Sequence, residues 1–285
     1  MSESVPKSVP STKVFLEGRY RKHARDLPQT VFFCPQCKGH PRRRRGCERC
    51  EGFGKLTRDS VQELVGWVAG SAFKTRKNKF HGAGREDIDV RMLGDGRPFV
   101  LEMVNPKCLD VDLAALESEI NRRNEGRLQV LGLHWTEKAR VRVIKETPHA
   151  KEYEARVEVE GDPLAATIDR VRGQRFAVTQ QTPARVAHRR ADKARERWVE
   201  FVGFDRDVDA PEQPGKTTWR VRIRTEHGTY VKEVVNGESG ATKPSLAELL
   251  SLPCRCVELD VVAILDVEGR AEETRRTPAV FGENL

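Results

Sequence analysis

The stretch that decides the fold runs from residue 81 to residue 106 and reads HGAGREDIDVRMLGDGRPFVLEMVNP. From Ile88 to Met92 apolar residues alternate with polar ones, which is the period of a half-buried strand. Residues 94–96 have the composition of a tight hairpin turn, and residues 99–104 then return as a second strand. Asp87 stands just before the first strand. The pattern therefore predicts a hairpin that displays a carboxylate at the mouth of a strand.

The composition indicates an anionic partner. Among 285 residues, 51 Lys and Arg face 43 Asp and Glu, which gives a net charge of +8. An excess of positive charge favours nucleic acid over other anionic partners. The sequence contains no run of 18 apolar residues, and residues 1–30 lack the apolar middle of a signal peptide. We therefore expect a cytoplasmic protein that makes no contact with membranes.

The rest of the chain predicts an α+β fold with a largely antiparallel sheet. Residues 1–30 read as a polar, basic arm without useful periodicity. Helices are expected after a cap at Thr57 or Asp59, after a cap at Asp110 or Asp112, and over residues 245–250. Further strands are expected over residues 128–135, 140–144, 152–159, 175–178, 198–202, 218–223 and 257–262. Mixed strands and helices without regular βαβ alternation favour the α+β class over the α/β class.

Four of the seven cysteines form two Cys-x2-Cys pairs within seventeen residues. The ligands of this group would be Cys34, Cys37, Cys47 and Cys50. Two such pairs present four thiolates to one ion, and tetrahedral Zn²⁺ is the favoured occupant. The site would be structural, because four protein ligands leave no open position for water. The alternative is a set of unpaired, reduced thiols.

Two basic segments are candidates for contact with phosphate. Arg42 and Arg43 belong to a run of four arginines between the cysteine pairs, and a solvated charged loop is the alternative interpretation. A second concentration of cations lies in residues 180–197. Pro183 argues against one uniform helix, so we expect a strand and a turn that border a cleft. A third cluster follows at residues 226–235, where Gly228 permits a turn that aims Tyr230 and Lys232 from a helix start.

Together these motifs resemble those of the pseudouridine synthases. The residues from Gly84 to Asp87 resemble their Gly-Arg-x-Asp signature, and those from Tyr153 to Ala155 resemble their Tyr-x-Ala strand motif. The run from Gly228 to Lys232 resembles their Gly-Thr-Tyr-hydrophobe-basic motif. Longer runs at 85–94, 96–106 and 181–192, with the paired cysteines, are similar to the archaeal and eukaryotic Pus-ten type over about residues 31–268.

The resemblance implies a pseudouridine synthase fold and an isomerase. It implies a zinc module over residues 31–57 and a catalytic domain over residues 58–285, with subdomains of roughly 58–135 and 136–285. The expected reaction converts uridine to pseudouridine in the T arm of tRNA, at position 55 and in archaeal relatives also at position 54. The resemblance implies no organic cofactor. We expect tRNA as the partner and predict no obligate protein partner.

The resemblance also implies roles for particular residues. Asp87 would be the catalytic carboxylate, either attacking the uridine or assisting elimination, and both routes stay open. Lys232 would pair with Asp87, and Tyr153 would stack on the target base. The side chains expected to contact the RNA are Arg85, Tyr153, Tyr230, Arg189, Arg190, Arg42 and Arg43.

Two departures from the family pattern stand beside these expectations. Fewer than sixty residues precede the first catalytic-domain helix, where relatives usually carry a larger RNA-binding region, so we expect either a compact member or a different target. Residues 236–242 read NGESGAT where relatives have a His-Gly-acid-x-Gly-Arg-Thr run. The strongest competing interpretation is a non-catalytic zinc-ribbon RNA-binding protein on a synthase scaffold. It accounts for the cysteines and the charge, but not for the combination of Asp87, Tyr153 and Lys232.

Overall fold

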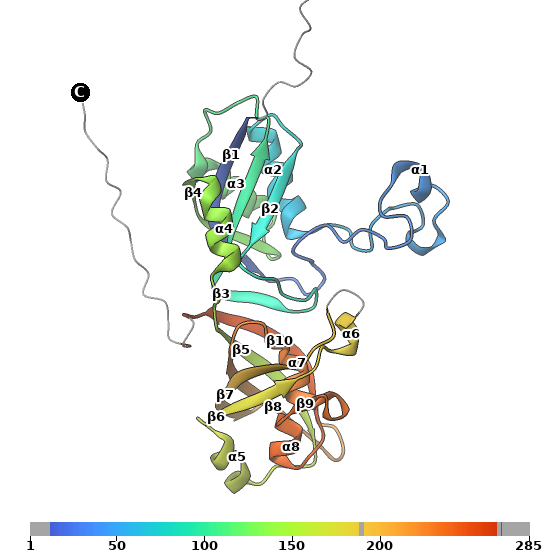
Figure 1. Ribbon diagram of the computed structural model, residues 1–285, viewed down its shortest axis with the longest axis vertical. Helices are drawn as coiled ribbons and strands as arrows, with labels where there is room; N and C mark the ends of the chain where they lie inside the picture. The colour runs from blue at the N-terminus through green and yellow to red at the C-terminus, as the bar shows by residue number, and fades with distance from the viewer. Residues whose placement is uncertain (1–11, 188–190, 267–268, 270–285) are drawn as a thin grey trace, which may run out of the picture.

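A computed structural model describes residues 12–187, 191–266 and 269, and its centre is one long mixed sheet (Figure 1). Within the described residues the sheet has ten strands in the order β4-β1-β3-β10-β5-β8-β7-β6-β9, with β2 paired to β3. The strands are β1 (Lys13–Lys22), β2 (Asn78–Gly82), β3 (Arg91–Val104), β4 (Leu128–Thr136), β5 (Lys151–Glu160), β6 (Arg175–Gln180), β7 (Arg195–Arg206), β8 (Lys216–Thr225), β9 (Thr242–Lys243) and β10 (Cys254–Ile264). The β3–β10 pair is parallel and the other pairs are antiparallel. The predicted α+β class with a largely antiparallel sheet is confirmed.

Helices cover the sheet in two groups. The helices are α1 (Pro41–Arg44), α2 (Val61–Ala72), α3 (Leu113–Arg123), α4 (Lys138–Glu146), α5 (Ala165–Val171), α6 (Ala184–Ala187), α7 (Val231–Asn236) and α8 (Leu246–Leu250). The helices α2, α3 and α4 lie with β1–β4 in one half of the molecule, and α5–α8 lie with β5–β10 in the other (Figure 1). In the part of the chain that the structure describes, no helix is long and apolar enough to span a bilayer.

The expected basic arm of residues 1–30 is wrong for residues 13–22, because these residues form β1 between β4 and β3. Leu16 and Tyr20 are fully buried there. The polar composition concealed the strand because its charged side chains have partners inside the fold. Glu17 accepts two hydrogen bonds from the guanidinium of Arg140, for example. The cysteine module is therefore an insertion between β1 and α2.

The expected hairpin at residues 94–96 is also wrong, because β3 continues through these residues as one strand of 14 residues. Opposite Tyr20 and Lys22 of β1, the chain makes a wide bulge between Met92 and Arg97. A Cβ on Gly94, whose φ is +56°, would lie 1.9 Å from the carbonyl oxygen of Val262. The glycine is thus required by close packing against β10. Asp87 accordingly lies in the loop between β2 and β3.

Two helices differ from the expectations. The predicted strand at residues 140–144 is α4, because Val141 and Ile144 share one helical face and pack against Phe15. The helix expected after Thr57 or Asp59 is α2, and its cap is Ser60, whose hydroxyl accepts a hydrogen bond from the backbone amide of Glu63. The cap of α3 at Asp112 is confirmed.

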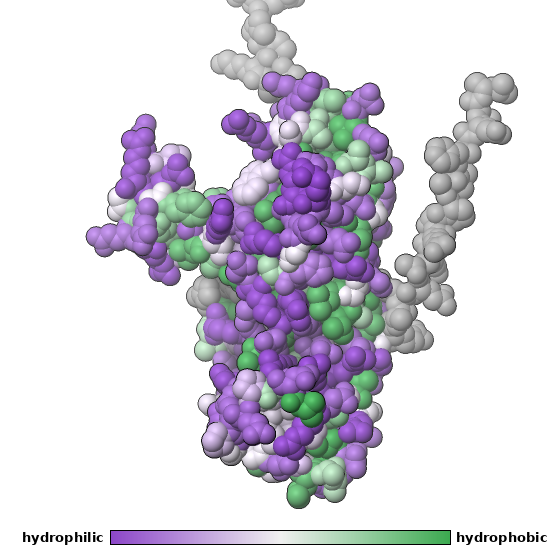
Figure 2. All heavy atoms as spheres, turned by 180° about the vertical axis from the view of Figure 1, so that it is seen from behind, coloured by the Kyte–Doolittle hydropathy of each residue, from purple (hydrophilic) through white to green (hydrophobic). Residues whose placement is uncertain are grey.

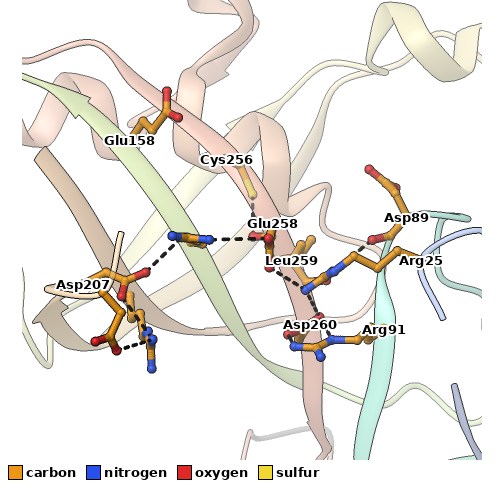
Figure 3. Close-up of polar contacts among 12 residues, drawn as sticks. Arg25, Asp89, Arg91, Glu158, Asp207, Cys256, Glu258, Leu259 and Asp260 are labelled. Carbon is orange, nitrogen blue, oxygen red and sulfur yellow. Dashed lines mark hydrogen bonds and ion pairs between the residues drawn. The ribbon is translucent and has the colours of Figure 1, made fainter. Parts of the chain in front are cut away.

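The two halves of the sheet meet where β3 runs parallel to β10. Backbone pairing there joins Arg91 to Asp260 and Met92 to Val261. The guanidinium of Arg91 donates to both carboxylate oxygens of Asp260, so a bidentate pair reinforces the short ladder (Figure 3). Arg25 adds an ion pair of 2.9 Å to the same carboxylate and one of 2.9 Å to Glu258 (Figure 3). These ion pairs hold β3 and β10 together where the two halves of the sheet meet, next to the candidate site.

Candidate active-site cleft and cysteine cluster

A cleft of about 480 Å³ opens at the junction of the two halves. The loop before β3, the strand β5 and the start of α7 contribute side chains to it. Of the residues predicted from the sequence, those that line the cleft are Arg85, Asp87, Tyr153, Tyr230 and Lys232. The volume lies within the range of about 300–1,000 Å³ that is usual for ligand sites. The fold thus brings the three motifs together although they are far apart in the sequence.

The loop that carries Asp87 is anchored from beneath by its neighbour Glu86. The Glu86 carboxylate lies 2.8 Å from Nε of Arg97, and both side chains are 1% exposed. The hydroxyl of Tyr20 donates to the same carboxylate at 2.9 Å. Gln29 donates both to that hydroxyl and to the carbonyl of Gly84, at 2.8 and 2.9 Å. A buried network of ion-pair and hydrogen-bond contacts of this kind favours one loop conformation.

Lys22 anchors the same loop through its backbone. The ammonium donates to the carbonyls of Asp87 and Ile88, at 3.1 and 2.8 Å, and to the carbonyl of Leu27 at 2.8 Å. Burial lowers the pKa of Lys22 to about 8, although nearby carboxylates oppose this effect. Three carbonyl acceptors satisfy the buried ammonium.

The Asp87 carboxylate lies against an arginine that the sequence analysis did not single out. Arg185, from α6, donates to Oδ2 of Asp87 at 2.6 Å. The same guanidinium donates to both oxygens of the buried Glu233 side chain in α7, at 2.6 and 3.2 Å. Burial acts to lower the pKa of Arg185, but the pairs with Glu233 and Asp87 outweigh it and raise that pKa above its ordinary value. Arg185 therefore joins the loop to two helices.

Lys232 does line the cleft, but its partner differs from the one expected. Its ammonium lies 2.7 Å from Oδ2 of Asp89, two residues beyond Asp87. Burial acts to raise the pKa of Asp89, and the contact with Lys232 lowers it below the usual value. The pairing of Lys232 with Asp87 is therefore corrected: Lys232 holds the far side of the same loop.

Two aromatic rings face the cleft. Tyr153 is half-buried on β5, and burial raises the pKa of its hydroxyl to about 12. Tyr230 is the N-cap of α7, and its backbone is fixed by Gln180, which donates to its carbonyl and accepts from its amide. The guanidinium groups of Arg185 and Arg195 lie 5.9 and 6.0 Å from the centroid of the Tyr230 ring. Both aromatic rings are therefore available to a flat ligand that enters the cleft.

Other predicted contact residues lie elsewhere. Arg189 and Arg190 fall outside the described residues. Arg42 and Arg43 are exposed on α1 of the cysteine module, away from the cleft. Figure 2 shows this module as a projection from the body whose surface is largely hydrophilic. The predicted cleft border at residues 180–197 is confirmed for Arg185, Arg195 and Arg197, with the short helix α6 in place of part of the expected strand.

The four cysteines of the two pairs converge into one buried cluster. Their sulfur atoms all lie within 4.8 Å of one another. The Sγ atoms of Cys34 and Cys47 are 3.8 Å apart, and those of Cys37 and Cys50 are 3.7 Å apart. A tetrahedron with Zn–S bonds of about 2.3 Å has edges of about 3.8 Å. The amide of Gly54 also donates to Sγ of Cys50 at 3.1 Å. The group therefore fits a metal ion.

Comparison with known proteins gives a consistent set of relatives. The family described as "Pus10, C-terminal" matches residues 15–265. The chain is 44% identical to the tRNA pseudouridine synthase Pus10 of Methanothrix thermoacetophila, over 88% of this chain and 53% of that protein. It is 41% identical to the proteins of the same name from Methanopyrus kandleri, over 90% and 57%, and from Korarchaeum cryptofilum, over 88% and 65%. The chain thus spans between half and two thirds of the length of these relatives.

A solved chain also has partial structural similarity. It is described as "Crystal Structure of a Cbf5-Nop10-Gar1 Complex", and the match covers 72% of this chain and 45% of that chain. The TM-score is 0.37 and the sequence identity is 17%.

Proposed function

The chain belongs to the Pus10 family, and from this membership we propose that it isomerises uridine to pseudouridine in tRNA. The proposed target is uridine 55 of the T arm, with uridine 54 as the second candidate position. The observation that carries the proposal is the shared cleft of Asp87, Tyr153 and Tyr230. A non-catalytic RNA-binding protein has no need for a carboxylate held by Arg185 in a cleft that two tyrosines also line.

Asp87 is the group that acts on the uridine. Its carboxylate is held between a buried network beneath the loop and the Arg185 guanidinium at 2.6 Å. A fixed carboxylate in a partly desolvated cleft suits a reaction in which one difficult bond exchange is divided into two easier steps. The same position serves an elimination route, in which the carboxylate takes a proton instead of forming a bond.

The aromatic rings and the basic residues hold the RNA. The target base stacks on Tyr153, and the exposed Arg85 at the mouth contacts the phosphate of the extruded nucleotide. Turning a base out of its stack costs a few kcal/mol, about the amount that stacking and phosphate contacts return. Arg42 and Arg43 on the projecting module contact more distant phosphates. Contacts of this kind position RNA and weaken with salt.

The cysteine cluster holds a structural Zn²⁺ ion in this proposal. The fit of the sulfur–sulfur distances to a tetrahedral site supports it. The ion shapes the module that carries the arginines and takes no part in the chemistry of the cleft.

The deciding experiment uses unmodified tRNA and maps pseudouridine at single-nucleotide resolution. Wild-type protein should form pseudouridine in the T arm, and Asp87→Ala should lower the rate by at least about 1,000-fold while it still binds tRNA. Asp95→Ala is the matched control, because Asp95 is an exposed carboxylate of the β3 bulge and does not line the cleft.

Three other outcomes would contradict the proposal. If both the wild type and Asp87→Ala bind tRNA without forming product, the protein is an RNA-binding module. If product forms equally with both proteins, the catalytic group lies elsewhere. If pseudouridine forms only at uridines outside the T arm, the proposed reaction is correct and the proposed target position is wrong.

A further inference from the structure

A lysine at the floor of the cleft has no part in the roles given so far. Lys151 is the first residue of β5 and stands two residues before Tyr153, so both side chains project from the same face of the strand. Both line the cleft. The Lys151 side chain is buried, with 8% of the residue exposed. Lys151 therefore lies beside the ring on which the target base is proposed to stack.

Among the residues that the structure describes, the surroundings of Lys151 contain cations and no acid paired with its amine. Among the described residues, its amine makes one hydrogen bond, donated to the carbonyl of His149 at 2.9 Å, and no ion pair. Burial and the positive charge of Arg97 lower the pKa of Lys151 to about 7. The charged and titratable groups near Lys151 include Arg97 of β3, His149 just before β5, Tyr153 of β5, Arg197 of β7, and Glu226 and His227 of the loop after β8. A buried amine in such a site is often neutral and able to accept a proton.

The proposed reaction needs such an acceptor. The N1–C1′ bond of uridine breaks, the uracil turns, and a C1′–C5 bond forms, which leaves C5 tetrahedral and still bonded to hydrogen. That C5–H bond must then break to restore the ring, and N1 must gain a proton. The two proton movements balance within the isomer, so one group that accepts a proton and then returns it is sufficient.

The other groups of the cleft are less suited to this task. The raised pKa of Tyr153, about 12, keeps its hydroxyl protonated at neutral pH. Asp87 is engaged by Arg185 and is assigned to the ribose side of the reaction. His227 lies at the mouth of the cleft, and its partial burial together with nearby cations lowers its pKa below 6.5, which makes it a weak acceptor.

We propose that Lys151 is a further catalytic residue, which accepts the C5 proton of the turned uracil and then delivers a proton to N1. The C5–H bond breaks as an N–H bond forms on the amine, and the resulting ammonium releases a proton as the N1–H bond forms. Because C5 and N1 are both bonded to C6, one flexible amine can reach both atoms. This role depends on the proposed pseudouridine synthase activity.

The test compares single-turnover rates on tRNA transcribed with uridine or with 5-deuteriouridine. Lys151→Met keeps an unbranched apolar side chain of nearly the same length and removes the amine, and its rate should fall by about 100-fold or more. Its deuterium effect should exceed that of the wild type, because breaking the C5–H bond becomes the slow step. Lys151→Arg should be as slow as Lys151→Met, because a guanidinium does not release its proton.

The pH dependence gives a second measurement. The neutral amine is the active form, so the wild-type rate should rise with pH through about 7, and Lys151→Met should lack this rise. His227→Gln should keep it, because the transition of His227 lies at lower pH. Lys138→Met is the matched control: Lys138 is exposed on α4, outside the cleft, and this variant should behave as wild type.

A third measurement does not depend on activity. Titration of the Lys151 ε-carbon by NMR, assigned by its loss in Lys151→Met, should give a midpoint near 7. A midpoint near the ordinary value for lysine would overturn the proposal. So would a wild-type rate in Lys151→Arg, which would assign the side chain a purely electrostatic role, or a slow Lys151→Met without an increased deuterium effect.

Failure of this role and failure of the proposed function can be told apart. An active wild type together with an equally active Lys151→Met overturns the role of Lys151 alone. A wild type that forms no pseudouridine in any tRNA overturns the function, and the role of Lys151 with it.

Discussion

Arg185 lies in the cleft and contacts residues from three of the segments that surround it. It contacts Asp87 in the loop and Glu233 in α7, and its guanidinium lies over the ring of Tyr230. Glu233 is buried and does not line the cleft, so its carboxylate acts on the cleft through Arg185. In the proposed reaction, Arg185 is thus a positioning residue that orients the Asp87 carboxylate.

Replacing Arg185 should therefore affect turnover more than binding. Arg185→Met should lower kcat about 100-fold, which is the usual effect of a small misplacement, while the KM for tRNA changes little. Glu233→Gln should lower kcat in the same direction, and the double variant should be no slower than Arg185→Met, because both changes remove one connected unit. Steady-state kinetics on tRNA measures all three.

The control for this set is Arg142→Met, which removes an exposed arginine that pairs with Glu146 on α4. It should leave both constants near wild type, as expected for surface ion pairs. A raised KM with unchanged kcat in Arg185→Met would instead mean that Arg185 only binds RNA.

The sequence alone could predict some of these residues and not others. Asp87, Tyr153 and Lys232 could be predicted because each belongs to a motif that resembles one of the pseudouridine synthase motifs. Arg185 belongs to a segment rich in cations, where no local pattern distinguishes one arginine from another. Its partner Glu233 is 48 residues away, so their pairing depends on how α6 and α7 pack. The sequence gives only a weak indication for Lys151. It stands two residues before Tyr153 on an alternating strand, which places both side chains on one face of that strand.

The bulge in β3 sets the path of the strand where the two halves of the sheet meet. Gly94 and Gly96 have positive φ, and the carbonyls of residues 94–96 accept hydrogen bonds from Arg19 and Arg21 of β1. Beyond the bulge toward its N-terminus, β3 pairs with β10 and leads back to the Asp87 loop. The shape of the bulge therefore fixes where the loop begins.

A side chain at Gly94 should be costly for this reason. Gly94→Ala adds a Cβ 1.9 Å from the carbonyl oxygen of Val262 at a strained φ. It should lower the free energy of unfolding by about 2–4 kcal/mol. Gly126→Ala is the matched control, because Gly126 also has positive φ (+72°) but its Cβ would meet nothing within 4 Å. Its cost should stay near 1 kcal/mol. Urea denaturation followed by circular dichroism measures both, and equal costs would contradict the role of close packing.

Helix and strand patterns explain which elements were predicted correctly. The caps and apolar spacing of α3 and α8 are local, and both helices were found. The alternation in residues 140–144 indicates a strand, but Val143 is exposed and α4 is set by packing of Val141 and Ile144 against the sheet. Residues 94–96 are equally typical of a hairpin and of a bulge. Contacts with β1 and β10, which are distant in sequence, decide between them.

The cysteine module is a separate small unit attached to a larger body (Figure 1). Within the described residues, its buried cluster consists of the four cysteines themselves. We expect a unit with so small a core to need the proposed metal ion for folding. The body has its own extensive core in the sheet and helices. Its place as an insertion was not predicted, because residues 13–22 read as a polar arm.

Loss of the metal should therefore unfold the module and leave the body folded. Cys34→Ser/Cys37→Ser should reduce zinc content from one ion per chain to none, weaken tRNA binding and leave the main thermal transition in place. Cys108→Ser is the control, because Cys108 lies outside the cluster and should keep the ion. Metal analysis, tRNA affinity and calorimetry test these outcomes. Undiminished zinc would exclude the cysteine site, and loss of the main transition would show that the module supports the whole fold.

The base of the module is closed by backbone pairing. The amide of Cys34 donates to the carbonyl of Gly54 at 3.0 Å, and the amide of Leu56 donates to the carbonyl of Phe32 at 2.9 Å. The chain thus leaves and rejoins the body at nearly the same point. Segments with adjacent ends can be lengthened, shortened or exchanged at little entropic expense to what they are attached to. The module could therefore be lengthened, shortened or replaced to change its proposed contacts with RNA, and the residues that line the cleft would stay in place.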